Sequence, residues 1–184
     1  MGERIWTISN TISAGRVLLI APLGYCLFTE FEGSRTWAVL VITVGILSDF
    51  LDGFLARRLH QVSELGKIVD PLADKIAIGL LALFLVIVGD IPLWYFIAIL
   101  ARDMLILLGG MYIRKKKHVV AQSNWPGKIA VTAVAVVLLL SVLREPQVEG
   151  LRMVVLWASI ALMSFSLVVY TQRLFIGRGF ERRS

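Results

Sequence analysis

Long apolar runs separated by short polar breaks make up most of this chain of 184 residues. Each run holds about 18 to 25 residues, enough for an α-helix to cross a hydrocarbon core of roughly 30 Å. The breaks are too short for a separately folded region, so we expect a single domain over residues 1–184. The pattern predicts an all-α fold, a polytopic bundle of six transmembrane helices near residues 8–28, 36–58, 68–89, 91–113, 126–143 and 151–174.

The composition and the placement of charge agree with a membrane protein. Hydrophobic residues make up 58% of the chain and the mean hydropathy is +0.80, whereas soluble domains are roughly 45–50% apolar. The loops on one predicted side carry thirteen Lys or Arg residues, and those on the other carry only Arg35, Arg144 and Arg152. This asymmetry predicts that both termini are cytoplasmic. It also indicates that the net charge of +6 faces anionic lipid of the cell membrane and not nucleic acid.

Four aspartates interrupt the apolar pattern where the second predicted span ends and the third begins. Asp49 and Asp52 lie near the end of the second span, and Asp70 and Asp74 lie near the start of the third. A carboxylate at membrane depth costs about 3 kcal/mol on insertion scales unless it is paired or bound to a metal, so each is a candidate functional residue. Because both span ends fall on the cation-rich side, we expect the site at the cytoplasmic face.

Helical geometry predicts that the chemical groups of each span share one face. At about 100° per residue, those of the second span fall within an arc of roughly 140°, and those of the third, on a continuous helix, within about 80°. They are Asp49, Asp52, Gly53, Ala56 and Arg57 in the second span and Gly66, Asp70 and Asp74 in the third. Pro71 would clash in a helix interior, so we expect the third helix to begin near residues 67–70, with Pro71 in its first turn.

A cluster of carboxylates without His or Cys indicates a hard cation, namely Mg²⁺, Mn²⁺ or Ca²⁺. Two ions are favoured over one, because paired metals commonly hold both oxygens of a phosphoryl displacement. Gly53 would permit close approach of a ligand, and Arg57 could pair with phosphate oxygens. The alternative is that the aspartates only form ion pairs with the nearby cations Arg57, Arg58, Lys67 and Lys75.

The spacing of these residues resembles the signature of a known family. The pattern D-x2-D-G-x2-A-R-x8-G-x3-D-x3-D is met in full from Asp49 to Asp74. It is similar to that of the CDP-alcohol phosphatidyltransferases, whose chain length and six-span layout this sequence also resembles. The resemblance implies transfer of a phosphatidyl group from CDP-diacylglycerol to an alcohol with release of CMP. It further implies a homodimer surrounded by membrane lipids.

The resemblance also implies a role for each residue of the pattern. Two divalent cations, Mg²⁺ or Mn²⁺, would be bound by Asp49, Asp52, Asp70 and Asp74. Asp74 would in addition be the catalytic base that takes the proton of the acceptor hydroxyl. The site for the nucleotide of the CDP-lipid would comprise Asp49, Gly53, Ala56, Arg57 and Gly66. Outside the pattern, Asn10 is a further candidate for this site, although it could instead cap the first helix.

The acceptor is predicted from residues outside the aspartate pattern. An acceptor with its own phosphate would suit the cations Arg16, Arg102, Lys128 and Arg173, all on the predicted cytoplasmic side. Residues 9–16, 101–103 and 123–128 resemble segments of the bacterial phosphatidylglycerophosphate synthases, a branch of the family, which implies glycerol 3-phosphate as acceptor. Two features depart from that branch, because Asp103 replaces a usual Glu and no proline lies near Asn10. Arg102 could instead pair with Asp103 or extend to the membrane surface.

Two alternatives stay open from the sequence. The same chemistry could use another acceptor, such as inositol phosphate, serine or a further alcohol. A divalent-cation channel or transporter is a different class of protein, but a pore needs carboxylates distributed along the membrane normal, whereas these gather toward one side. The pattern therefore favours the phosphatidyltransferase.

Overall fold

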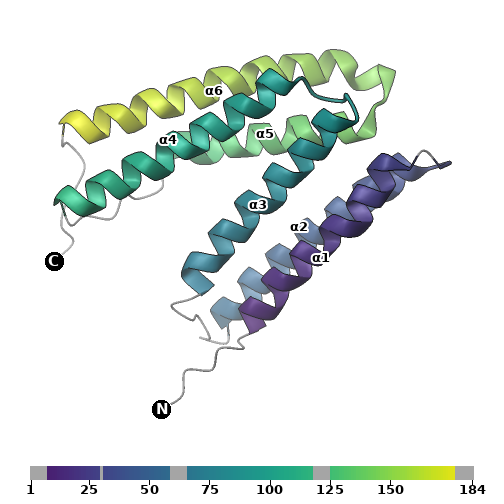
Figure 1. Ribbon diagram of the computed structural model, residues 1–184, viewed down its shortest axis with the longest axis horizontal. Helices are drawn as coiled ribbons and strands as arrows, with labels where there is room; N and C mark the ends of the chain where they lie inside the picture. Colours follow the sequence, from purple (N-terminus) through teal and green to yellow (C-terminus); the bar gives the residue numbers. More distant parts are fainter. Residues whose placement is uncertain (1–7, 30, 59–65, 118–124, 177–184) are drawn as a thin grey trace. The chain divides into compact units, whose positions relative to one another are not determined.

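The computed structural model describes the backbone of residues 8–29, 31–58, 66–117 and 125–176, and the side chains of residues 18–29, 31–48, 75–110 and 125–172. Within these residues the chain is all-α, as predicted, and contains no strand (Figure 1). Every predicted span coincides with a helix to within four residues at each end. The helices are α1 (Ile8–Phe28), α2 (Ser34–Arg58), α3 (Gly66–Ile87), α4 (Leu93–Lys117), α5 (Trp125–Leu143) and α6 (Glu149–Ile176), with a short 3-10 helix, η1 (Pro146–Val148).

Three stretches of the described helices are long and apolar enough to cross a membrane. They are Leu93–Gly110, Trp125–Leu143 and Pro146–Gln172. Shorter apolar stretches lie in the other three helices, at Leu18–Phe28, Ser34–Ser48 and Lys75–Ile87. These features indicate a membrane protein, while the complete six-span topology and the cytoplasmic termini stay predictions.

The helices group into two compact units, one within Met1–Asp90 and the other within Ile91–Ser184. We call them unit 1 (α1–α3) and unit 2 (α4–α6), and each is described by itself. The prediction of one domain over the whole chain stays a prediction.

In unit 1, α1 packs against both α2 and α3. Leu23 and Leu27 of α1 and Leu85 of α3 are buried there. Gly24 allows a close approach, because a Cβ atom at this position would lie 3.2 Å from the ring of Phe84. The ring of Phe84 also meets that of Phe28 edge-on, with the centroids 5.1 Å apart. The absence of a side chain at Gly24 and the aromatic pair thus both contribute to the close packing of α1 on α3.

One end of unit 1 is held by an ion pair between Arg35, at the start of α2, and Asp90, just after α3. The Asp90 side chain is only 4% exposed. The chain reaches Asp90 through Gly89, which has a φ of +81°, and the Asp90 N–H donates to the carbonyl of Leu85 at 2.8 Å. Helices commonly end at a glycine in the left-handed conformation. Here the turn at Gly89 places Asp90 within reach of Arg35.

In unit 2, α6 packs along α5 and also against α4. The buried positions of all three helices recur at spacings of three and four residues, as expected for a packed helical face. They are Tyr95, Ile99 and Arg102 in α4, Ala130, Val134, Val137, Leu138, Ser141 and Val142 in α5, and Leu156, Ser159, Met163 and Ser166 in α6.

Polar residues on these faces form hydrogen bonds within the unit. The Tyr95 hydroxyl lies 2.7 Å from Ser159 Oγ, and Ser159 donates its own proton to the carbonyl of Leu156 at 2.7 Å. Tyr95 therefore donates to Ser159, and neither hydroxyl is left unpaired in the apolar interior.

The glycine at the end of α3 gives a stability prediction. Gly89→Ala is expected to lower the free energy of unfolding by about 1 kcal/mol, because alanine is strained at positive φ. Gly79→Ala is the matched control: Gly79 lies inside α3 with open space around it, and alanine there is expected to raise stability by about 0.5–1 kcal/mol. Denaturant unfolding in detergent would measure both. Equal stabilities of the two variants would contradict the role given to Gly89.

Candidate functional site

The aspartate pattern lies on two regular helices. Asp49, Asp52, Gly53, Ala56 and Arg57 all belong to α2, and Gly66, Asp70 and Asp74 all belong to α3. Both stretches are continuous helix, which is the condition on which the predicted arcs of about 140° and 80° depend. The side chains of these residues lie outside those that the structure describes. The backbone thus supports the shared faces, while metal binding and catalysis stay predictions.

The start of α3 differs from the prediction. The helix begins at Gly66, so Pro71 falls in its second turn and not in the first. Proline there has no N–H to donate to the carbonyl of Lys67, four residues earlier, so the helix forgoes one backbone hydrogen bond. The earlier start places Gly66, Asp70 and Asp74 in one uninterrupted helix.

The two acidic stretches lie at the same level of unit 1. Arg35 and Asp90 join the start of α2 to the end of α3, so the two helices run in opposite directions from that point (Figure 1). At 1.5 Å per residue, Asp52 lies about 25 Å along α2 from Arg35, and Asp74 lies about 20 Å back from the end of α3. The acidic ends of both helices therefore lie at the end of unit 1 opposite the ion pair.

This placement suits the metals predicted from the sequence. Four carboxylates carried by two helices at one level supply only oxygen donors, which is the ligand chemistry of Mg²⁺ and Mn²⁺. The residues present at the acidic end of unit 1 therefore fit a site for these cations.

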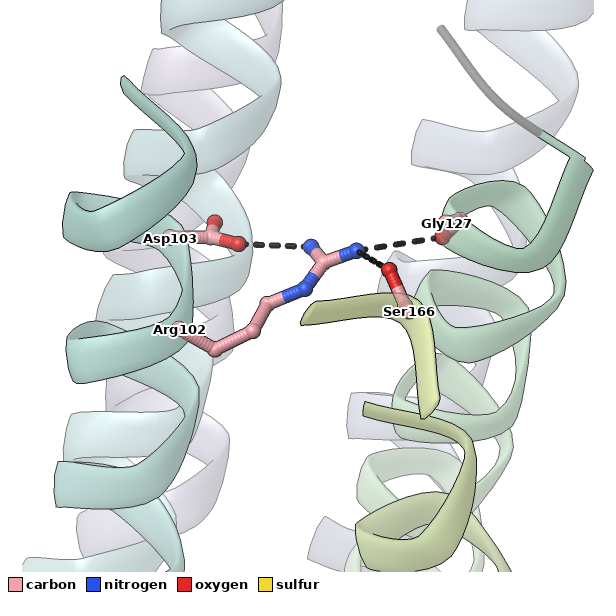
Figure 2. A network of polar contacts seen from close by, with 4 residues as sticks. All are labelled: Arg102, Asp103, Gly127 and Ser166. Atoms are coloured by element: carbon pink, nitrogen blue, oxygen red, sulfur yellow. Dashed lines mark hydrogen bonds and ion pairs between the residues drawn. The ribbon is translucent and has the colours of Figure 1, made fainter. Parts of the chain in front are cut away.

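In unit 2, Arg102 lies at the centre of a polar network that joins three helices (Figure 2). Its Nη1 donates to Asp103 Oδ1 at 2.7 Å, and its Nη2 donates to the carbonyl of Gly127 at 3.3 Å and to Ser166 Oγ at 3.5 Å. Arg102 is 8% exposed, and its buried Nε has no hydrogen-bond partner among the described residues. The alternative interpretation, in which Arg102 pairs with Asp103, is confirmed, and the binding of an acceptor phosphate by Arg102 stays a prediction.

Of the other three predicted cations, the structure describes the side chain of Lys128 alone. Lys128 is exposed in the first turn of α5, with its ammonium nitrogen 5.7 Å from the ring centroid of Trp125. Arg16 belongs to α1 and Arg173 to α6, and their side chains lie outside the described residues. Asn10 is the third residue of α1, so it lies inside the helix and not at the N-cap, the position that the alternative interpretation required.

Two partners of Arg102 were not among the residues expected from the sequence. Gly127 contributes only a backbone carbonyl, which no side-chain motif reveals. Ser166 is a polar residue in an apolar helix, seven residues after Ser159, and this recurrence on one helical face was a usable signal.

Comparisons with known proteins support the interpretation of the aspartate pattern. Residues 6–165 match the family model of the CDP-alcohol phosphatidyltransferases. The chain is 32% identical over 170 residues to the CDP-diacylglycerol–glycerol-3-phosphate 3-phosphatidyltransferase of Aquifex aeolicus, an alignment that covers 89% of this chain and 93% of that protein. It is 29% identical over 175 residues to a probable phosphatidylglycerophosphate synthase of Mycobacterium tuberculosis, covering 92% of this chain and 82% of that protein.

A second group of relatives carries another name. The chain is 36% identical over 131 residues to the cardiolipin synthase (CMP-forming) of Streptomyces coelicolor, covering 70% of this chain and 61% of that protein. The chain thus spans less than two thirds of the length of this cardiolipin synthase, but nearly all of the Aquifex protein.

Proposed function

We propose that this protein, which belongs to the CDP-alcohol phosphatidyltransferase family, transfers the phosphatidyl group of CDP-diacylglycerol to glycerol 3-phosphate, giving phosphatidylglycerophosphate and CMP. The observation that carries the proposal is the complete aspartate pattern on α2 and α3, at the end of unit 1 opposite the Arg35–Asp90 pair. The reaction belongs to phospholipid biosynthesis in the cell membrane.

The membrane arrangement that we infer has six spans, with both termini and the acidic end of unit 1 at the cytoplasmic face. The lengths of α1, α2 and α3, which are 21, 25 and 22 residues, support it. Each of these helices is long enough to cross a hydrocarbon core of about 30 Å. A cytoplasmic site would admit the polar acceptor from water and the CDP-lipid from the bilayer. We also propose a homodimer, on the resemblance to the family alone.

Asp49, Asp52, Asp70 and Asp74 are proposed to hold two divalent cations, Mg²⁺ or Mn²⁺. When bound, such ions neutralise the pyrophosphate and the charge that develops on the departing CMP. The nucleotide would be held by Gly53, Ala56 and Arg57 of α2, together with Asn10, Asp49 and Gly66. The glycines leave room for a phosphate close to the backbone, and the arginine can bind its oxygens in pairs.

Asp74 is proposed to act as the base. It takes the proton of the acceptor hydroxyl while the hydroxyl oxygen forms a bond to the phosphorus that carries the lipid. The bond from that phosphorus to the oxygen bridging it to CMP then breaks, and CMP leaves with the electron pair. The residues of the site need only orient the two substrates and hold one proton, so no covalent enzyme intermediate is required.

We propose Lys128 as a ligand of the acceptor's phosphate. Arg16 of unit 1 and Arg102 and Arg173 of unit 2 are each, by themselves, further candidates for binding this phosphate or for arranging its ligands. Glycerol 3-phosphate carries a phosphate monoester, which needs several cationic donors. The extent of the alignments supports this acceptor, because the Aquifex protein, named for glycerol 3-phosphate, aligns over 93% of its length.

A second candidate is cardiolipin synthesis, favoured by the relative that bears this name. Cardiolipin contains two phosphatidyl groups on one glycerol, so a route that forms CMP would transfer phosphatidyl to phosphatidylglycerol. That acceptor is itself a lipid and carries no phosphate monoester. The aspartate chemistry would be the same, and only the acceptor site would differ.

An acceptor assay decides between the candidates. The full chain, purified in detergent with CDP-diacylglycerol and Mg²⁺ or Mn²⁺, receives one acceptor at a time: glycerol 3-phosphate, phosphatidylglycerol, inositol phosphate or serine. We expect CMP release with glycerol 3-phosphate to exceed that with phosphatidylglycerol or serine by at least about 100-fold, because neither of these offers a phosphate monoester to the cations of the site. Inositol phosphate does carry a phosphate monoester, so a smaller margin is expected over this acceptor.

A reaction without acceptor gives the rate of simple hydrolysis and serves as the control. Release of CMP mainly with phosphatidylglycerol would make cardiolipin synthesis the correct function. Failure to release CMP with any acceptor would rule out the phosphatidyltransferase proposal.

A further inference from the structure

Arg102 is an unusual residue for the middle of an apolar helix. It lies within the candidate span Leu93–Gly110 and is 8% exposed, and a buried charge in such a segment is costly unless it is paired and hydrogen-bonded. The carboxylate of Asp103, itself 25% exposed, supplies the opposite charge. The two remaining acceptors, Gly127 and Ser166, come from α5 and α6.

The bond to Gly127 places Arg102 against the start of α5. Gly127 immediately precedes Lys128, and both belong to the first turn of the helix. Figure 2 shows the guanidinium group extending from α4, with Asp103 on one side and with Gly127 and Ser166 on the other. The guanidinium group of Arg102 thus connects α4 to the first turn of α5 and to α6.

Arg102 and Lys128 differ in how accessible they are to a ligand. Both terminal nitrogens of Arg102 already donate to protein acceptors, and its unpaired Nε is buried together with the rest of the residue. Lys128 is exposed, with its ammonium group beside the ring of Trp125. An exposed ammonium group can meet an anion without breaking a protein hydrogen bond.

We propose that Arg102 is a positioning residue for acceptor recognition, holding the first turn of α5 through Gly127 and Ser166 so that Lys128 on that turn meets the acceptor's phosphate. The inference rests on the proposed function for its ligand, and it assigns different tasks to two cations of unit 2, namely positioning to Arg102 and contact with the phosphate to Lys128. Ser166 of α6 contributes to this positioning, because its hydroxyl accepts a hydrogen bond from the guanidinium group.

A double-mutant cycle separates positioning from direct contact. Ser166→Ala is expected to raise the KM for glycerol 3-phosphate about 3-fold, and Lys128→Ala about 10-fold or more, with the KM for CDP-diacylglycerol unchanged. Because Ser166 acts through Lys128, the double variant should show no higher KM than Lys128→Ala alone. Multiplied effects in the double variant would overturn the proposal and indicate that Arg102 meets the acceptor directly.

Ser159→Ala is the matched control. Ser159 and Ser166 are both fully buried serines of α6, but Ser159 bonds to Tyr95 and Leu156 and not to Arg102. Both variants should lose some thermal stability, and only Ser166→Ala should change the KM for the acceptor. If Ser159→Ala raised this KM equally, the rise in Ser166→Ala would reflect a general loss of packing in unit 2. That result would refute the inference.

Hydrogen exchange tests the positioning without any activity. In the full chain, peptides that cover the first turn of α5 should exchange faster in Ser166→Ala and in Arg102→Gln than in the unaltered protein or in Ser159→Ala. Unchanged exchange in both Arg102-network variants would overturn the proposal. If the unaltered protein is inactive with glycerol 3-phosphate, the proposed function fails by that result alone, while the exchange measurement still decides whether Arg102 positions α5.

Discussion

Asp74→Asn is expected to lower the rate of CMP release at saturating substrates by about 10³-fold or more, while the affinity for the CDP-lipid falls much less. Asparagine keeps the size of the side chain and one oxygen that can bind a cation, but it cannot take a proton from the acceptor hydroxyl. Loss of a positioned general base typically costs about 10² to 10⁴ in rate. Steady-state kinetics with CDP-diacylglycerol, together with binding of a non-reactive CDP analogue, would give the two quantities.

Asp90→Asn is a suitable control for this experiment. Asp90 is also an aspartate of unit 1, but it pairs with Arg35 at the end opposite the aspartate pattern. Its substitution should lower thermal stability, because it weakens a largely buried ion pair, and should leave the turnover of the folded protein nearly unchanged. If Asp74→Asn lost binding and turnover to the same extent, Asp74 would be chiefly a metal ligand and not the base.

Asp52→Asn is expected to weaken binding, in contrast to Asp74→Asn, which mainly lowers turnover. Metal binding and CDP-lipid binding should be lost together. Asp52 lies on the α2 face that also carries Gly53 and Arg57, so the loss of a carboxylate there removes both the cation and the pyrophosphate that it would hold. We expect the apparent affinity for Mn²⁺ to fall at least about 10-fold, because an amide is a much weaker ligand for a hard cation than a carboxylate. Electron paramagnetic resonance of free Mn²⁺ would follow this directly.

Glu145→Gln provides the corresponding control, since Glu145 is an exposed acid just before η1 in unit 2. Its substitution removes one negative charge and changes no residue of α2 or α3, so the affinity for Mn²⁺ should stay the same. Unaltered Mn²⁺ binding in Asp52→Asn would show that the aspartates of α2 are not metal ligands, and it would favour their pairing with nearby cations.

The helices could be predicted closely because the membrane leaves few choices. In lipid each backbone N–H and C=O must be satisfied within the segment, so a long apolar run reads as a helix with little ambiguity. The run predicted at 126–143 became α5, Trp125–Leu143, and the run at 8–28 became α1 with the same bounds. The prediction was wrong at Pro71, which lies in the second turn of α3 and not in the first.

Arg102 shows what the sequence left open. From the sequence, the pairing with Asp103 and the binding of an acceptor phosphate were both reasonable, because Asp103 is adjacent and the surrounding helix is apolar. The structure confirms the pairing and adds Gly127 and Ser166, which lie 25 and 64 residues away along the chain. Such partners depend on how α4, α5 and α6 rotate about their axes, and that rotation is set by side-chain packing along the whole unit.

The sequence by itself was sufficient to identify the family of this protein and the residue spacing on which the proposed chemistry rests. The spacing from Asp49 to Asp74 places carboxylates on one face of each of two helices, and helical periodicity alone is sufficient for that conclusion. Only the tertiary structure showed the ion pair between Arg35 and Asp90, because residues 55 positions apart in the chain meet only when α2 and α3 pack in one unit. It also decided that Arg102 is held by three acceptors within unit 2, because those contacts arise when helices distant in sequence pack together.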